Sequence, residues 1–259
     1  MIRRRLYVEE RFSPLARWSF RLSLFSVPVV VLGALLYRFG LLDFRPAMAT
    51  LAIGLAMALL AGLMGVVAFF VIWESGWRGM GRSVAAVAIA LGVLTGPASV
   101  LARGVMLPQL TDIATDAEDP PRFRALAFAH PRSANPQTYP GEAAAMTQRH
   151  TYPGIKPVDL SATAEEAYNA VKALVEKRHW RILDEVQPRG PRRDGQIEAV
   201  ASSPVMGVRS DVVIRIRATP KGSRVDMRSV SRYGGHDLGR NARHIEGLMA
   251  DLSAERRRK

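Results

Sequence analysis

The stretch "AMATLAIGLAMALLAGLMGVVAFFVIW", residues 47 to 73, runs without a single charged side chain. About 20 mostly apolar residues are enough to cross the hydrocarbon core of a bilayer. Two further apolar stretches, residues 18–40 and 83–102, flank it and are separated from it by short loops. One such run could also be a buried helix of a soluble protein. Three in succession predict a three-helix transmembrane region over residues 18–107.

The first apolar stretch also has features of a secretory signal peptide, because a basic region precedes its uncharged core from Leu22 to Tyr37. A cleavage site of small residues is expected after such a core, but Arg38 and Phe39 follow instead. Arginines at the two ends of the stretch can extend their charged groups to the lipid headgroups. The sequence therefore favours an uncleaved first transmembrane helix.

Basic residues are distributed unevenly around the three predicted spans. The tail and the start of the first span hold Arg3, Arg4, Arg5, Arg11, Arg17 and Arg21, whereas the two loops hold only Arg38, Arg45, Arg78 and Arg82. An excess of basic residues marks the cytoplasmic side of a membrane protein. We therefore expect the tail, residues 1–17, in the cytoplasm of a bacterium. Three crossings of the inner membrane then place everything after Leu107 in the periplasm.

Small residues recur every fourth position on the second and third predicted spans. The two ridges are Gly54, Ala58 and Gly62 on the second span and Ala88, Gly92 and Gly96 on the third. Small side chains let helix backbones approach closely in lipid. We predict that these two helices touch along the ridges, which could also hold a membrane-protein partner. The alternative is that glycine and alanine are simply common in such helices.

Composition and charge narrow the classes of function. The chain of 259 residues has a formal net charge of +13 and no cysteine, so disulfides, thiolate nucleophiles and cysteine-based metal sites are excluded. No ionisable residue lies deep within a predicted span, which argues against a proton pump or transporter. A basic domain across the membrane from the chromosome does not meet nucleic acid, so no nucleic-acid partner is predicted.

Residues 108–157 contain eight of the sixteen prolines and few stretches in which apolar residues recur with the period of a helix or a strand. We interpret them as an extended linker that wraps the domain that follows. Its start clusters four carboxylates, at Asp112, Asp116, Glu118 and Asp119. Calcium prefers carboxylate oxygens, but this spacing matches no calcium loop. No metal or other cofactor is predicted.

Residues 158–259 carry the pattern of a folded α+β domain. Thr163 and Glu166 have the spacing of a capping box before an amphipathic helix. Alternating segments then predict strands, of which "DVVIRIRAT" and "SRVDMRSVSR" form a hairpin if Lys221-Gly222 is its turn. That turn pairs Ile216 with Met227 and Arg217 with Asp226, and it sets Arg215 opposite Arg228. We expect a membrane region followed by an antiparallel sheet covered by helices.

The closing stretch "MRSVSRYGGHDLGRNARHIEG", residues 227–247, has two interpretations. In the structural one, Gly234-Gly235 forms a turn and Asp237 caps a helix that begins near Leu238. In the other, arginines converge with free amides at the helix start and bind an anion. The candidate binding residues are Arg215, Arg228, Arg232, His236, Asp237, Asn241 and Arg243. Because no P-loop, HExxH or GxSxG motif occurs, no catalytic residue is assigned.

Several segments resemble the bacterial family catalogued as domain of unknown function 1499. They are "TDIATDAEDPPRF", "YPGIKP", the W-x-I spacing at Trp180, and "RSVSRYGGHDLGRNARHI", and the likeness covers about residues 108–252. The closing motif matches at Ser231, Arg232, Gly234, Asp237, Gly239 and Asn241. This chain departs from the family at His244-Ile245, and at Ser210-Asp211, where members often have two acids. The resemblance implies a domain boundary and a bacterial envelope setting, and it implies no activity, cofactor or catalytic residue.

Three functions are compatible with these features. The first is a membrane-anchored envelope protein without catalytic activity, whose periplasmic domain binds a partner or an anionic ligand. The second is a periplasmic hydrolase that uses His236, Asp237 and arginines. The third is an accessory subunit of a larger membrane complex, docked through the ridges of small residues.

Overall fold

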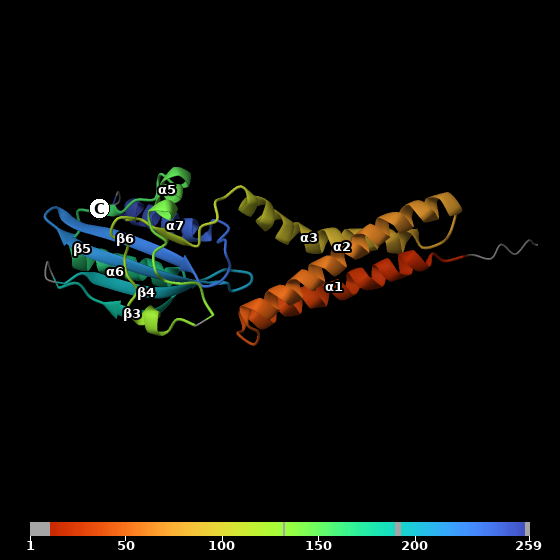
Figure 1. Cartoon of the computed structure of the whole chain (residues 1–259), viewed down its shortest axis with the longest axis horizontal. Coiled ribbons are helices and arrows are strands. Elements are labelled where there is room, and N and C mark those ends of the chain that lie inside the picture. Colours follow the sequence, from red (N-terminus) through yellow and green to blue (C-terminus); the bar gives the residue numbers. More distant parts are fainter. Residues whose placement is uncertain (1–10, 132, 190–192, 257–259) are drawn as a thin grey trace, which may run out of the picture. The chain divides into compact units, whose positions relative to one another are not determined.

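The computed structural model describes residues 11–131, 133–189 and 193–256. The chain forms two compact units, Met1–Leu101 and Ala102–Lys259 (Figure 1). The first unit is helical, and the second combines a sheet with helices. The predicted combination of a helical membrane region and an α+β domain is therefore confirmed.

In the part of the chain that the structure describes, three helices are long and apolar enough to cross a membrane: α1 (Pro14–Arg38), α2 (Phe44–Ser75) and α3 (Met80–Val105). Ser13 caps α1 by accepting a hydrogen bond from the Ala16 amide, and Pro14 occupies the first turn, where no amide donor is needed. Gly76 ends α2 in the left-handed conformation with a φ of 69°. The last turn of α3, from Ala102 onward, belongs to the second unit.

The ridge of small residues on α2 contacts two different helices. Gly54 lies against α1, because a Cβ placed on it would be 2.6 Å from Val30 Cγ2. Gly62 lies against α3, where a Cβ would be 3.0 Å from that of Ala90. Gly92 and Gly96 have no such neighbour within 4 Å. The prediction that α3 contacts α2 along these two glycines is therefore wrong, because α3 turns the side of the helix that carries Ala90 toward α2.

The second unit is built on a six-stranded antiparallel sheet with the order β1-β6-β5-β4-β3, and β2 pairs with the other end of β6. The strands are β1 (Asp112–Ala114), β2 (Val158–Leu160), β3 (Arg181–Val186), β4 (Gly195–Ser202), β5 (Arg209–Thr219) and β6 (Gly222–Ser231). The first lies near the start of the proline-rich segment, and the second follows directly after that segment. They are too short for an alternating pattern to reveal them in the sequence.

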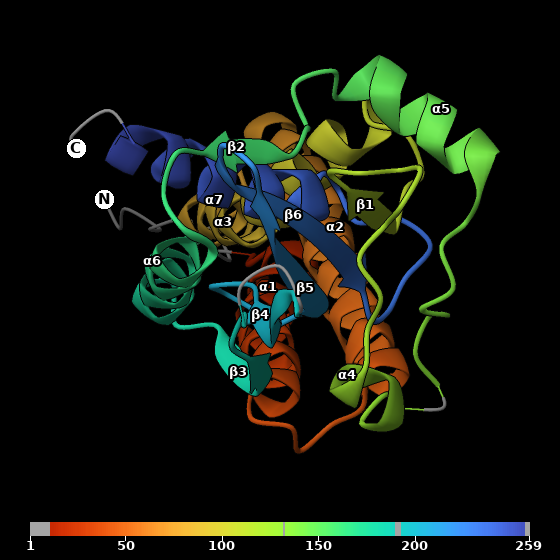
Figure 2. The same cartoon turned by 90° about the vertical axis from the view of Figure 1, so that its left-hand side faces the viewer.

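Helices α6 (Ala164–Lys177) and α7 (Arg240–Arg256) cover one face of the sheet (Figure 2). The capping box at Thr163 and Glu166 is present, as predicted. Side chains from both helices join the alternate residues of the strands in one core. Its largest fully buried members include Tyr168, Val171, Ile197, Ile214, Ile216, Met227, Ile245, Leu248 and Leu252. Short helices α4 (Ala125–Phe128) and α5 (Glu142–Thr151) lie within the segment predicted to be a linker.

The β5–β6 hairpin has a different register from the predicted one. Its turn is Pro220-Lys221, so Thr219 pairs with Gly222 and Arg215 pairs with Asp226. The predicted pairs are wrong by two residues, as is the expected opposition of Arg215 and Arg228. Proline is favoured at the second position of a tight turn and glycine at its fourth. A Cβ on Gly222 would also collide with the Leu160 carbonyl oxygen of β2, so only glycine fits there.

Candidate functional site

The sheet face opposite α6 and α7 is a buried layer of charged side chains. It carries Glu198, Asp211, Asp226, Arg228 and Arg232, each at most 4% exposed. The proline-rich segment covers this face, with α4 on the side of the sheet away from α6 (Figure 2). Because an unpaired charge is costly to bury, each of these groups must have a partner.

Arg228 is held by the start of the proline-rich segment. Its Nε donates to Asp112 Oδ1 at 3.0 Å, and its Nη2 donates to Asp112 Oδ2 at 2.6 Å. The guanidinium also donates to the Gln137 carbonyl at 2.6 Å and lies between the rings of Phe123 and Tyr139. Burial raises the pKa of Asp112, and the bonds from Arg228 oppose that shift. Arg228 is therefore fully occupied inside the protein.

Arg232 and Asp211 form a second buried pair, with Arg232 Nε donating to Asp211 Oδ1 at 2.6 Å. The other carboxylate oxygen lies 3.1 Å from His130 Nδ1 and accepts from Gln137 Nε2 at 2.9 Å. The His130 Nε2 atom lies 2.7 Å from the Asn135 carbonyl oxygen. This cluster joins β5 and β6 to the proline-rich segment.

Among the described residues, no arginine pairs with Glu198. Its carboxylate accepts from the backbone amides of Arg124 and Leu126, at 2.6 and 2.7 Å, and from Gln196 Nε2 at 2.7 Å. Backbone amides can stabilise a buried carboxylate in place of a cation. Glu198 thereby fixes the first turn of α4.

Four of the remaining predicted residues lie in α7 or in the segment that precedes it. Asp237 accepts from the amides of Gly239 and Asn241, both at 2.8 Å, and caps α7, which begins at Arg240. Asn241 is fully buried, accepts from Ser229 Oγ and donates to the Thr111 carbonyl. These contacts fasten α7 to the sheet.

The structure does not bring the seven predicted residues together. Arg228 and Arg232 lie under the proline-rich segment, whereas Asn241 lies on the helix-covered face. Arg243 is exposed, and Arg215 pairs with Asp226 and Asp119. The three predicted arginines on or next to β5 and β6 face the proline-rich segment, whereas the other four residues belong to α7 or to the segment that precedes it.

A cleft of about 470 Å³ in the second unit is the better candidate for a binding site. It is lined by Thr115, Asp116, Ala117, Glu118, Gln148, Arg149, Tyr152, Pro153, Ile155, Lys156 and Arg224. Gln148 positions α5 there, since its side-chain amide donates to the Ala114 carbonyl and accepts from the Ala114 amide. Sequence reasoning missed this site because its three segments are far apart, although two of them lie in the stretches "TDIATDAEDPPRF" and "YPGIKP" that carry the family resemblance.

The cleft combines basic groups and the carboxylates of Asp116 and Glu118 with an apolar wall. Arg224 donates to Asp116 Oδ2 at 3.0 Å, so that pair is already neutralised. Arg149 pairs with Glu142 outside the lining, and Lys156 is exposed. The pKa of Tyr152 is raised, first by burial and then by Asp237 and Glu246, so its phenol stays protonated and can donate a hydrogen bond.

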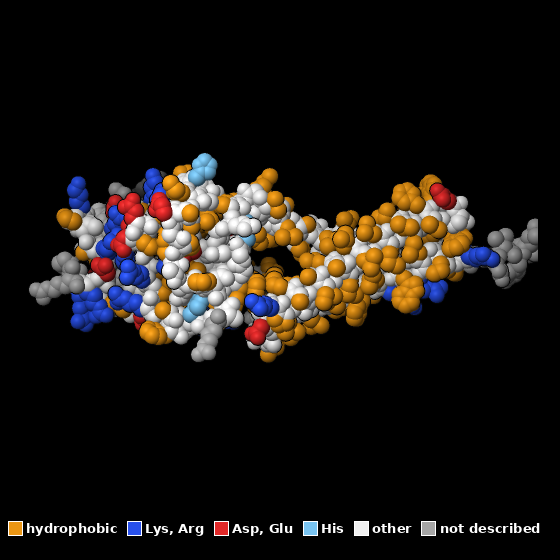
Figure 3. Space-filling view, viewed as in Figure 1, with side chains coloured by type: hydrophobic (Ala, Val, Ile, Leu, Met, Phe, Trp, Pro, Cys, Tyr) orange, Lys and Arg blue, Asp and Glu red, His pale blue; other side chains and the backbone are white. Residues whose placement is uncertain are grey.

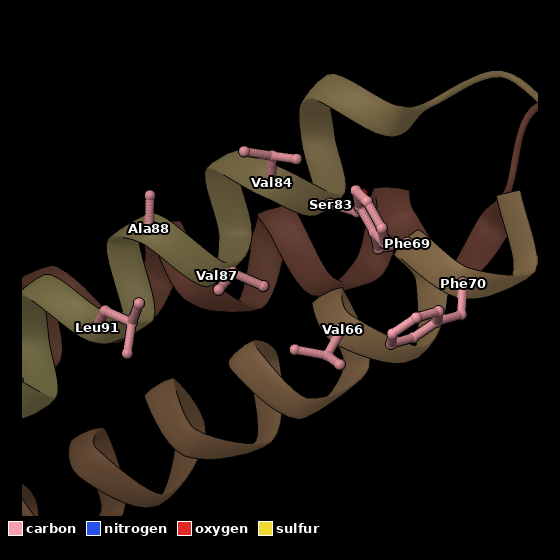
Figure 4. Close-up of a pocket in the computed structure, with 8 residues that line it drawn as sticks. All are labelled: Val66, Phe69, Phe70, Ser83, Val84, Val87, Ala88 and Leu91. Atoms are coloured by element: carbon pink, nitrogen blue, oxygen red, sulfur yellow. The ribbon is translucent and has the colours of Figure 1, made fainter. Parts of the chain in front are cut away.

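A second hollow, of about 370 Å³, lies between α2 and α3 (Figure 4). Its wall is almost entirely carbon and is formed by Val66, Phe69, Phe70, Ser83, Val84, Val87, Ala88 and Leu91. The Ser83 hydroxyl donates to the Met80 carbonyl of its own helix. The shape of this groove suits an apolar chain, but the groove has no available polar group that would orient a ligand.

Comparison with solved structures gives two matches of low similarity. A Mesorhizobium loti protein has 13% identity and a TM-score of 0.26, and the match covers 38% of this chain and 94% of that one. A Nitrosomonas europaea protein has 14% identity and a TM-score of 0.22, with 38% and 92% covered. No curated protein matches the chain.

The family comparison covers more than half of the chain. The family described as "Protein of unknown function (DUF1499)" matches residues 112–252. This range begins with β1 and extends into α7, so it includes the whole sheet. The resemblance noted in the closing motif is confirmed, and the chain belongs to the DUF1499 family.

Proposed function

We propose that the chain is a non-catalytic envelope protein of the bacterial inner membrane, and that its periplasmic domain binds an anionic ligand in the cleft. The observation that carries the proposal is the lining: three basic residues, Arg149, Lys156 and Arg224, face a wall that includes Tyr152 and Ile155. Since Arg224 already pairs with Asp116 and Arg149 pairs with Glu142, the exposed charge of Lys156 remains to attract an anion. A small anion with an apolar or aromatic part suits this combination.

The hydrolase alternative has less support from the geometry. His236 Nδ1 accepts from the Leu238 amide, and its Nε2 lies within 3.1 Å of the Gly104 and Leu107 carbonyl oxygens. Both oxygens of Asp237 accept backbone amides. A general base needs a ring nitrogen or an oxygen directed at the substrate. These two side chains instead hold the chain that precedes α7.

Binding of phenyl phosphate to the full chain in nanodiscs tests the proposed site. We expect Lys156→Glu to weaken this binding by at least about tenfold, because reversing one charge next to an anion costs more than about 1.4 kcal/mol. Isothermal titration calorimetry measures the change. The matched control is Lys221→Glu, since Lys221 is an exposed lysine in the β5–β6 turn, outside the cleft. Equal affinity of the two variants, or no binding by the parent chain, contradicts the proposal.

The proposed orientation predicts opposite results for two reporters fused after Lys259. Alkaline phosphatase folds and is active only in the periplasm, so that fusion should be active. Green fluorescent protein exported in an unfolded state does not become fluorescent there, so that fusion should be dark. The expectation follows from the arginines before the first span and from three crossings. A fluorescent and phosphatase-inactive pair would place the domain in the cytoplasm.

A further inference from the structure

Four segments of the second unit meet at one end of the sheet. The Asn135 amide donates to the Arg232 carbonyl at 2.7 Å, and its side chain donates to the Gly234 carbonyl at 2.8 Å. The Arg232 amide donates to the carbonyl of Arg209, which begins β5 directly after the β4–β5 loop. His236 connects this end to the chain that leaves α3, through the Gly104 and Leu107 carbonyls. Within the second unit, this end of the sheet is therefore bonded to the last turn of α3 and to the segment that follows it.

Large apolar side chains are exposed at the same end. Phe128, two residues before His130, is 94% exposed, and Val205 in the β4–β5 loop is 79% exposed. Val105 and Met106, where α3 ends, are 86% and 89% exposed. Large apolar side chains that are exposed from separate segments at one end of a domain are typical of an interaction surface. We call these four residues the apolar rim.

The charges around the apolar rim are of one sign. Arg103 and Arg209 are exposed beside it. The described carboxylates at this end, Asp211 and Asp237, are buried and bonded internally. Acidic side chains instead gather with basic ones toward the β5–β6 turn, as the visible face in Figure 3 shows. A surface with apolar and basic side chains and no exposed carboxylate suits lipid headgroups.

We propose that the apolar rim docks into the headgroup region of the bilayer that the chain itself spans. Val105 and Met106 continue directly from α3, so the rim is continuous with the part of the chain already in lipid. Phe128 and Val205 then insert beside them, and Arg103 and Arg209 pair with lipid phosphates. The docking does not depend on the cleft or on which side of the membrane the domain occupies.

Single spin labels test the docking, because the chain contains no cysteine. Val205→Cys and Phe128→Cys are labelled in the full chain, which is placed in nanodiscs of phosphatidylcholine with phosphatidylglycerol. The matched control is Lys221→Cys, at the opposite end of β5, about 30 Å away by the rise per residue of a strand. Power saturation with oxygen and with a water-soluble nickel complex measures the depth of each label.

We expect the labels at 205 and 128 to lie roughly 5–10 Å below the lipid phosphates, while the label at 221 stays in water. Adding Arg209→Glu should bring the label at 205 toward water in the anionic discs. The proposal is contradicted if the labels at 205 and 128 are as accessible to the nickel complex as the label at 221. So would dipolar broadening between labels, because it would show that a second copy of the chain covers the rim.

Discussion

Replacing Arg228 by methionine is expected to lower the free energy of unfolding of the second unit by about 3–5 kcal/mol. The substitution leaves Asp112 buried without its guanidinium partner and removes the donor to the Gln137 carbonyl. Unfolding is followed by the fluorescence of Trp180, in a background where Trp18, Trp73 and Trp77 are phenylalanine. A loss below about 1 kcal/mol, typical of a surface ion pair, would contradict the prediction.

The double variant Asp112→Leu with Arg228→Met separates the burial of a lone charge from the loss of packing. Replacing both members of a buried pair by apolar groups is often neutral, so most of the lost stability should return. Arg217→Met is the matched control, because Arg217 is partly exposed and shares its partners with neighbouring arginines. If the double variant is no more stable than Arg228→Met, the buried charge is not the cause.

The loss in Arg228→Met should also depend on pH. Burial already raises the pKa of Asp112, and without Arg228 the pKa rises further. A carboxyl with a raised pKa in the folded state stabilises the fold while it is protonated, and this contribution is lost as the pH rises through that pKa. The variant should therefore be closest to the parent at acid pH, and a loss independent of pH would contradict this account.

The second large effect is a loss of stability on acidification, caused by His244. Burial lowers the pKa of this side chain to about 4 from its usual 6.5, and Arg240, Arg243 and Arg178 add to the shift. The ring also packs edge-on against Trp180 at 5.3 Å, and its Nδ1 lies 3.5 Å from Ser229 Oγ. His244 is therefore neutral in the folded protein at neutral pH.

The sign of the effect follows from proton binding. Below pH 6.5 the unfolded chain takes up a proton at His244 that the folded chain rejects, so stability falls as the pH drops from 6.5 toward 4. A shift from 6.5 to about 4 corresponds to a loss on the order of 3 kcal/mol. Stability curves of the Trp180 background at pH 7, 6, 5 and 4.5 measure it. This contribution is fully present above pH 6.5.

His244→Phe removes the titrating group and keeps an aromatic ring against Trp180, so its stability should depend less on pH over this range. His150→Phe is the control, because His150 is exposed at the end of α5. A parent and a His244→Phe variant that lose equal stability between pH 6.5 and 4.5 would show that other groups cause the acid sensitivity.

Features encoded over a few neighbouring residues were predictable from the sequence. The three spans follow from runs of apolar side chains, and the start of α6 follows from Thr163 and Glu166. The core face of β5 follows from the alternation of Val212, Ile214 and Ile216. These patterns depend on the periods of helix and strand, which any segment expresses by itself.

The register of the β5–β6 hairpin could not be predicted from local sequence patterns alone. A shift of two residues keeps every side chain on its face, so alternation alone cannot choose between Met227 and Val225 as the partner of Ile216. The choice rests on the turn at Pro220-Lys221 and on the close approach of β2 to Gly222. The second of these is a tertiary contact.

The amino-acid sequence by itself determined the division into an apolar front and a basic α+β domain, because hydrophobic periodicity is a local property. Only the tertiary structure decided the use of the charged residues. Arg228 is paired with Asp112, 116 residues earlier, and the cleft joins residues near Asp116, Arg149 and Arg224. The sequence shows which charges exist, but burial assigns their partners, because a charge removed from water must be paired with whatever group the fold brings beside it.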